Sequence, residues 1–380
     1  MAFFKYYRPG CYFDNAIRYN ELYFSENKEL NDPHDLKASF YFEDSIELWG
    51  ALLALKPEYD TWNLNIFIDT KSRLIWEELN ELFKGKAFDS IKGNISEEIE
   101  KNKQGLLDIF KKHLKVELSL PENISFHESY PSEQRAELCS LWLSALLARA
   151  VDHVFFSASF SASALSPMMW AHYADGFKGC VIIYEPGPEG VFGLTHNLFD
   201  RDQMRFQFQK VNYIDGDKRI PVLECAVKGK AKAQYAFLQK NAFWEYECEH
   251  RLLSAEKSDA ILESIGKVRR SSQRTRVLHH QTNDIVGVIF GPRCTPQLKE
   301  KVDLTLLDNR RRAGNKPFYL FDTELTLQGQ LVISSAKMQC CTVIPGLPVS
   351  PGGLHQMISA EELPRVLAAI GIHEHNLRSE

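Results

Sequence analysis

The chain has 380 residues, of which 44% are hydrophobic and 25% are charged, a composition typical of folded proteins and not of disordered or collagen-like ones. Lys and Arg number 45 against 50 Asp and Glu, so the net charge of −5 gives no overall attraction to nucleic acid or anionic lipid. This length predicts either one large domain with insertions or two domains, with a core sufficient to support a cleft.

The sequence contains no segment that we expect to cross or contact a membrane. Its longest apolar run, residues 138–151, is shorter than a bilayer span and carries Arg149, so we interpret it as a buried helix. The first ten residues lack the apolar stretch and cleavage site of a secretion signal, which favours a cytoplasmic location. The eight cysteines show no paired or zinc-like spacing, so we expect reduced thiols and no metal.

The first part of the chain reads as short strands followed by helices. Residues 21–25 predict a strand, and Asn-Asp-Pro at 31–33 predicts a turn, because Asn and Asp satisfy local backbone donors and Pro fixes φ. From about 45 to 115, apolar residues recur at helical spacing, and a helix is predicted from Ser132 to about 150. We interpret residues 45–150 as a helical insertion.

The middle of the chain alternates compactly between element types. Residues 154–184 predict a strand, a short helix over 168–173, and a second strand from Gly179. Residues 209–214 predict another strand, and residues 228–241 predict a helix with lysines on its solvent face.

The last part of the chain contains further predicted strands and a helix, without an internal repeat. Further predicted elements are a buried strand at 285–290, strands at 318–327 and 330–336, and a helix at 359–370. We predict an α+β domain over 1–292, with the helical insertion, and a C-terminal α/β extension over 293–380.

Residues 244–251 hold the densest set of chemically active side chains. As a strand, they would place Glu245, Glu247, Glu249 and Arg251 on one face, because side chains alternate along a strand. Neighbouring carboxylates repel one another unless a cation, a hydrogen-bond donor or a ligand meets them. The alternative is a solvated edge on which the arginine neutralises part of the charge.

The turn-forming segment 170–178 offers a second set of candidates. His172 could donate to a ligand phosphate or ribose or act as a general base, and it could equally stabilise the following turn. Arg8 lies beside two tyrosines, which suits recognition of a nucleotide phosphate and also suits stacking at a domain boundary. The basic run 267–276 could contact phosphates or form a solvated loop.

Several catalytic signatures are absent from the sequence. It has no GxGxxG after a strand, no GxxxxGK[ST], no HExxH and no GxSxG. These absences argue against Rossmann dehydrogenases, P-loop NTPases, zincins and α/β-hydrolases.

An ordered series of motifs resembles the bacterial family called domain of unknown function 2971. The series runs over residues 5 to 292 and comprises KYYRP, LYFS with LNDP, MMWAHYADGFKGCVIIYE, VNY, a lysine before WEYECEHR, and IVGVIFG. This chain departs from the family pattern at His34 and Asp35, where Phe-Glu is usual, at Phe177, where His is usual, and at His250, where Trp is usual. The first departure puts an early acidic site residue in doubt.

The motif layout is also similar to that of ADP-ribosyltransferases, in which two antiparallel sheets form a cleft for NAD. That resemblance implies an α+β fold with mixed or antiparallel split sheets around a cleft. It implies NAD as co-substrate, with Glu247 or Glu249 stabilising an oxocarbenium-like ribose and Arg8 contacting phosphate or ribose. Ser157 would support the site, His172 or Tyr173 would lie by the nicotinamide or target, and Trp170 and Arg251 would help bind the dinucleotide.

We therefore expect an NAD-using ADP-ribosyltransferase or NAD glycohydrolase of a toxin or antiphage type, acting on a macromolecular target. One alternative is a non-enzymatic sensor module, with a protein partner from the same defence cassette, in which the regions of Trp170 and Trp244 form a protein-binding surface. Another is a nuclease that uses the carboxylates with Mg²⁺.

Overall fold

The computed structural model describes most of the chain. The described residues are 1–32, 34–36, 39–55, 64–89, 95–116, 131–151, 153–216, 218–228, 234–235, 237–257, 276–314, 316–340 and 354–372. Nearly all of the basic run 267–276 lies outside these ranges.

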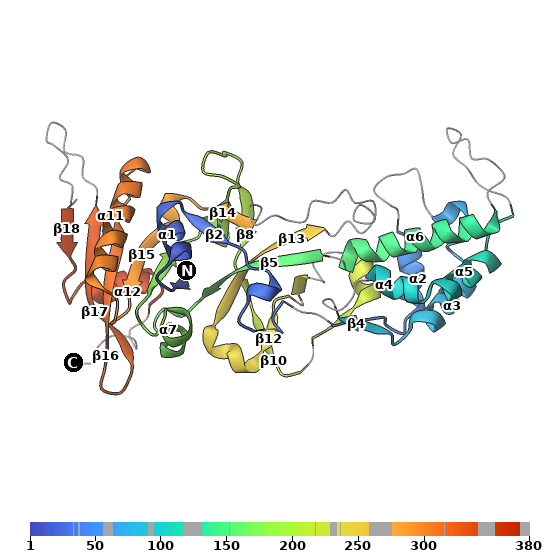
Figure 1. Ribbon diagram of the computed structural model, residues 1–380, viewed down its shortest axis with the longest axis horizontal. Helices are drawn as coiled ribbons and strands as arrows, with labels where there is room; N and C mark the ends of the chain where they lie inside the picture. The colour runs from blue at the N-terminus through green and yellow to red at the C-terminus, as the bar shows by residue number, and fades with distance from the viewer. Residues whose placement is uncertain are drawn as a thin grey trace.

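A mixed sheet forms the centre of the molecule (Figure 1). Its neighbouring strands are antiparallel except for the parallel pair β15 and β16. In the described residues nine strands take part, in the spatial order β18 (Leu354–Met357), β17 (Leu331–Cys340), β16 (Phe318–Leu325), β15 (Ile285–Phe290), β6 (Cys180–Tyr184), β1 (Phe3–Tyr7), β5 (His153–Ser161), β13 (Glu249–Lys257) and β9 (Gln209–Lys210).

Side-chain alternation gives this sheet two buried faces. On β6, Ile182 packs in the cluster that contains residues of α1 (Cys11–Arg18) and α11 (Pro296–Arg312). The next residue, Ile183, packs in the cluster that contains residues of α7 (Pro167–Tyr173) and α12 (Leu363–Ala369). Because helices cover both faces, the central strands can be apolar throughout, as β15 is.

Helices form a separate layer at one end of the molecule (Figure 1). They enclose a third core, to which Trp49, Phe83 and Leu143 contribute fully buried side chains. The helices of this layer are α2 (Ile46–Leu53), α3 (Arg73–Phe83), α4 (Ile95–Lys101), α5 (Lys103–Lys112), α6 (Ser132–Val151) and α8 (Val222–Lys228). Most of them fall where the helical insertion was predicted, and α6 begins at the predicted Ser132.

Short strands and 3-10 helices complete the described structure. Three small sheets are pairs of strands: β10 (Asn212–Ile214) with β12 (Gln239–Asn241), β14 (Val277–His279) with β2 (Glu21–Tyr23), and β7 (Val191–Leu194) with β8 (Met204–Gln207). In a further small sheet, β3 (Ser39–Tyr41) lies between β11 (Arg219–Pro221) and β4 (Ala87–Asp89). The 3-10 helices are η1 (Asn27–Glu29), η2 (Leu64–Ile66), η3 (Pro188–Gly190), η4 (Ala242–Glu247) and η6 (Thr282–Asp284).

The predicted α+β class with mixed and antiparallel sheets is confirmed. The helix predicted over 228–241 is wrong at its end, because residues 239–241 form strand β12 and pair in parallel with β10. The strands beyond residue 292 extend the central sheet directly from β15. The division into 1–292 and 293–380 stays a prediction, as do the split sheets of an ADP-ribosyltransferase.

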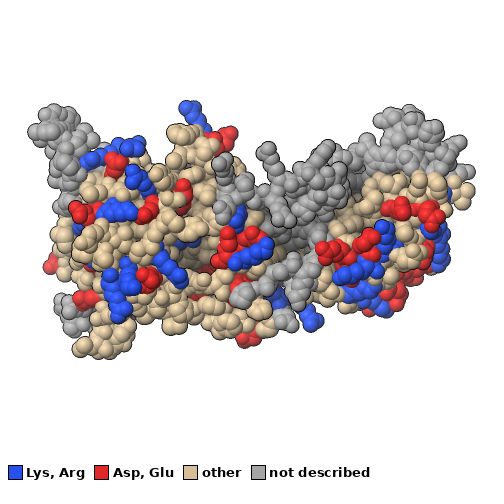
Figure 2. All heavy atoms as spheres, viewed as in Figure 1, with Lys and Arg blue, Asp and Glu red and all other residues tan. Residues whose placement is uncertain are grey.

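Charges of both signs are interspersed on the helical end of the face shown in Figure 2. Among the ion pairs of the helical layer, Lys101 and Lys103 each pair with the glutamate three residues earlier. None of the helices among the described residues is both long and apolar enough to span a bilayer.

Candidate functional site

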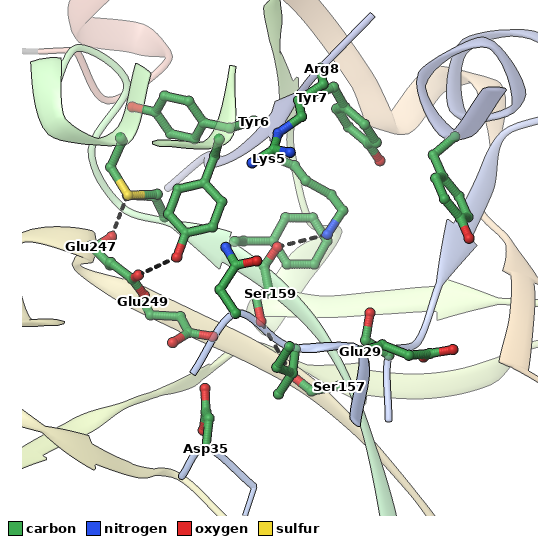
Figure 3. A pocket seen from close by; sticks show the side chains of 18 of the residues that line it. Lys5, Tyr6, Tyr7, Arg8, Glu29, Asp35, Ser157, Ser159, Glu247 and Glu249 are labelled. Atoms are coloured by element: carbon green, nitrogen blue, oxygen red, sulfur yellow. Dashed lines mark hydrogen bonds between the residues drawn. The ribbon is translucent and has the colours of Figure 1, made fainter. Parts of the chain in front are cut away.

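A pocket of about 430 Å³ opens beside the centre of the sheet. It is lined by β1 and the start of α1, by the loop after β2, by β5, by α7, and by residues between 240 and 249. Figure 3 shows the labelled side chains, with Glu247 and Glu249 on one side of the pocket, Glu29 on the other, and Lys5 between them. The size is within the usual range for small-molecule sites.

A network of buried charges forms one wall of the pocket. Lys240 Nζ donates to Glu247 Oε2 and, over 3.0 Å, to Glu249 Oε2. Arg251 donates to both oxygens of Glu249, at 2.8 and 2.9 Å, and to Asp35 Oδ2 at 2.6 Å. Each of these five side chains is at most 6% exposed.

The charges in this network do not cancel. Three carboxylates (Asp35, Glu247 and Glu249) face two cations (Lys240 and Arg251), so the ionised network carries a net charge of −1 (2 − 3). Although burial alone would raise the pKa of Glu249, Arg251 and Lys240 lower it well below its usual range. That acid is therefore ionised, and its main role is to hold the two cations.

Glu247 differs from Glu249 in its proton affinity. Burial raises its pKa above the ordinary value, with Lys240 opposing the shift. Tyr173 also bonds to it, donating its hydroxyl to Oε1 over 2.6 Å. Because Glu247 lines the pocket and has no guanidinium partner among the contacts described, it is the carboxylate best placed to respond to a ligand.

A sharp turn in the backbone brings the two glutamates together. Asn241 caps η4 by accepting from Phe243 N at 3.1 Å, and Glu247 is the last residue of that helix. Cys248 then adopts a left-handed conformation with φ of 46° before Glu249 begins β13. Ser161 Oγ donates to Glu247 O over 2.6 Å, which fixes the turn against β5. A non-glycine residue at positive φ is held there by its surroundings.

The pocket lining also includes two cations, Lys5 and Arg8, that have no acidic partner among the described residues. Lys5 Nζ donates to Ser159 O over 2.8 Å, and Arg8 Nη2 donates to His172 O over 2.8 Å. Within the described part of the chain, neither side chain forms an ion pair with a carboxylate, and both line the pocket. Burial lowers the pKa of Lys5 to about 8, and the charge of Glu249 opposes the shift.

The structure brings most of the predicted site residues together. Glu247, Glu249, Tyr173, Ser157 and Arg8 all line the pocket. Their catalytic or binding roles stay predictions.

Three predicted site residues do not line the pocket. Arg251 is fully buried behind Glu249, where it orients the acids and does not face a ligand. His172 is exposed, and its Nδ1 lies 3.1 Å from the hydroxyl of Tyr246. That the regions of Trp170 and Trp244 form a protein-binding surface stays a prediction, but Trp170 itself is 0% exposed and donates to Ala164 O over 2.9 Å, so its side chain is not accessible to a ligand or partner. Packing of the large indole in the core between α7 and the sheet is the physical reason.

The predicted strand over 244–251 is wrong in its first half. Residues 242–247 form the 3-10 helix η4, and only Glu249 onward is strand. As a result Glu245 is exposed and leaves the acidic group, while Glu247 and Glu249 converge through the turn at Cys248.

Sequence reasoning missed three members of the site. Lys240 and Lys5 each belong to a motif quoted from the sequence, but neither was predicted to be a site residue. Asp35 was doubted because it replaces a glutamate, yet its shorter carboxylate reaches Arg251. The signal that could have identified Asp35 is its position two residues after LNDP, where the family pattern also has an acid.

No arrangement of three or more His, Cys, Asp or Glu side chains suited to a metal ion occurs within the described ranges. Between Glu247 and Glu249, where a shared metal would bind, lies the ammonium group of Lys240. Of the basic run, Arg269, Arg270 and Arg274 lie outside the described residues, and Arg276 is bonded to Glu29.

Comparison with known proteins gives one match. Residues 169–252 match the family model described as "Protein of unknown function (DUF2971)". This segment contains most of α7, Lys240 and the acidic turn, and thus much of the pocket's acidic side. No curated protein and no solved structure matches the chain.

Proposed function

The chain belongs to the DUF2971 family, whose description assigns no activity, and we propose from its pocket that it binds NAD and breaks the bond between nicotinamide and ribose. The released ADP-ribosyl group would pass to a macromolecular target or to water. The supporting observation is that Glu247, in a network of net charge −1, shares a pocket with Lys5 and Arg8, two cations that form no ion pair with any described carboxylate.

The cations and the carboxylates of the pocket lining match the two charges of this substrate. The pyrophosphate of NAD is anionic and suits Lys5 and Arg8, because an ammonium and a guanidinium both donate charge-assisted hydrogen bonds to phosphate. The nicotinamide ribose becomes positive as its bond breaks and suits the carboxylate side. Aromatic lining residues, including Tyr7, Phe160 and Trp244, would exclude water around the sugar and base.

The proposed reaction needs electrostatic support more than proton transfer. The bond between C1′ of the ribose and the ring nitrogen breaks, and its electron pair leaves with nicotinamide, which becomes neutral. The ribose carries the positive charge until an oxygen or nitrogen nucleophile bonds to C1′ and loses a proton. Glu247 would stabilise the positive sugar, and a fixed charge in a partly dry site does so strongly.

Neighbouring groups hold Glu247 in place for this role. Tyr173 bonds to Oε1 and Lys240 to Oε2, so both carboxylate oxygens are fixed before substrate arrives. Prepared orientation of this kind avoids reorganisation during the reaction. Lys240 and Tyr173 are thus positioning residues in this proposal.

The test is nicotinamide release from NAD by the purified chain, measured by chromatography with and without cell extract. Glu247→Gln should reduce release at least about 100-fold, the scale of losing one dominant electrostatic group. Glu245→Gln is the matched control, because that residue lies in the same 3-10 helix but is exposed. Circular dichroism and ADP-ribose binding should show that the Glu247→Gln variant stays folded.

Two results would contradict the proposal. One is equal turnover by wild type and Glu247→Gln, and the other is absence of both NAD binding and turnover in the wild type under all conditions. The predicted toxin or antiphage role depends on this activity and stays a prediction.

A binding module is the second candidate function. It is supported by Phe243, which is 66% exposed on η4 beside the pocket residue Trp244. In that case Phe243→Ser would abolish capture of a partner, while Glu247→Gln would leave it unchanged. A metal-dependent nuclease has less support, since Lys240 occupies the space between the two glutamates.

A further inference from the structure

An exposed aromatic ring forms part of the pocket lining. Tyr12, in the first turn of α1, lines the pocket and is 63% exposed. Three lining residues, Pro9, Gly10 and Cys11, connect it to Arg8 along the chain. The ring is therefore accessible to a ligand that also reaches the phosphate-binding cations.

A cluster of bonded side chains, Tyr23, Glu29 and Arg276, contacts this ring through Tyr23. The rings of Tyr12 and Tyr23 lie 5.6 Å apart at 43°. The Tyr23 hydroxyl donates to Glu29 Oε1 over 2.7 Å, and the guanidinium of Arg276 lies 5.2 Å from the Tyr23 ring centroid. Arg276 in turn donates to both oxygens of Glu29, at 2.8 and 3.3 Å. Tyr12 thus contacts a neighbour that hydrogen bonds already hold in place, so binding there would cost little additional ordering.

The position of this cluster fits the base of a dinucleotide that is distant from the reacting ribose. Glu29, which anchors Tyr23, lies across the pocket from Glu247, and Lys5 lies between them (Figure 3). A ligand with its pyrophosphate at Lys5 and its reacting ribose at Glu247 would direct its second base toward Tyr12. Asn31 and Asp32 line the same pocket and could accept hydrogen bonds from an exocyclic amino group.

We propose that Tyr12 forms the subsite for the adenine ring of the dinucleotide, which stacks on the exposed face of the tyrosine. This inference rests on the proposed function for its ligand. Stacking suits the site because a purine offers a large flat surface, and base-to-aromatic stacking is a substantial source of binding free energy. Tyr12 would therefore determine affinity and adenine preference but not the chemical step.

The experiment compares two ligands that share a phosphate and a sugar but differ in the base. AMP and ribose 5-phosphate are titrated against the full chain by calorimetry, without any need for turnover. Wild type and Tyr12→Phe should bind AMP more tightly than ribose 5-phosphate. Tyr12→Ala should weaken AMP binding about tenfold or more and leave ribose 5-phosphate unchanged. Tyr19→Ala is the matched control, because Tyr19 is 43% exposed at the other end of α1 and does not line the pocket.

These outcomes separate the subsite from the proposed reaction. Loss of the AMP preference in Tyr12→Ala supports the subsite, even if NAD is never cleaved. Equal AMP affinity in wild type and Tyr12→Ala overturns it, even if NAD is cleaved, and so does an absence of AMP binding to the wild type. In an active enzyme, Tyr12→Ala should raise KM for NAD with little change in kcat.

Discussion

Asp35 and Arg251 are 216 positions apart in the chain, and Arg251 Nη2 donates a 2.6 Å hydrogen bond to Asp35 Oδ2. Their side chains are 4% and 0% exposed, so this ion pair is shielded from water. It joins the loop after β2 to strand β13, which also carries Glu249. The early and late stretches of sequence therefore form one electrostatic unit at the pocket.

Removing the guanidinium should destabilise the fold strongly. Arg251→Met leaves Asp35 and Glu249 buried with Lys240 as their remaining cation, and loss of one partner from a buried network costs about 3–5 kcal/mol. Urea denaturation at pH 7 measures this loss in the free energy of unfolding. Arg312→Met is the control, because its ion pair with Asp308 is 77% and 58% exposed and should contribute less than about 1 kcal/mol.

Acid should reduce the difference between wild type and Arg251→Met. In the wild type the pKa of Glu249 is depressed, so its contribution to stability is present above the unfolded value of about 4.3 and is lost as the pH falls. The unfolding free energies of the two proteins should therefore differ fully between pH 7 and pH 5 and approach each other as the pH falls below about 4. A difference that grows in acid would contradict this account of the network.

The fall of the NAD turnover rate at acidic pH, the acid limb of the pH profile, should reflect the pKa of Glu247. Because burial raises its pKa, the rate should fall with decreasing pH at a value above the ordinary glutamate range. The Tyr173 hydroxyl bonds to the carboxylate and lowers that pKa, so Tyr173→Phe should move the limb to higher pH. Profiles of kcat against pH test this shift. Tyr235→Phe, at a tyrosine that is 51% exposed, should leave the limb in place.

Affinity for ADP-ribose should fall as the pH rises through about 8. Lys5 loses its charge there because burial lowers its pKa, whereas the charge of the pyrophosphate does not change over this range. Calorimetric titrations at pH 7 and pH 9 measure the effect. Lys5→Arg should bind equally at both values, and Lys5→Met should bind weakly at both. A pH dependence that persists in Lys5→Met would assign it to another group.

Gly179→Ala should disrupt the pairing of β1 with β6. A Cβ atom at this position would lie 2.1 Å from Tyr7 O, which is backbone and cannot move aside without shifting β1. We expect a loss of about 1–3 kcal/mol in the free energy of unfolding. Gly187→Ala is the control, since its nearest obstacle is Val191 O at 3.3 Å. Similar thermal midpoints for the two variants would contradict the prediction.

Local patterns predicted many of the elements of this fold. The apolar run 285–290 forms the buried strand β15, and the helix beginning at Ser132 is α6, because periodicity and capping depend on neighbouring residues alone. The boundary at Cys248 was not predictable in this way. Its left-handed conformation is held by contacts between the turn and β5, such as Ser161 with Glu247 O, and these are distant in sequence.

The sequence by itself determined the residue types of the site, since acids, lysines and tyrosines stand in ordered motifs. Only the tertiary structure decided which of them meet: Lys240 between two glutamates, Arg251 behind them, and Trp170 in the core. The physical reason is that charge compensation depends on distances of a few ångströms between segments far apart in the chain. No local pattern encodes those distances.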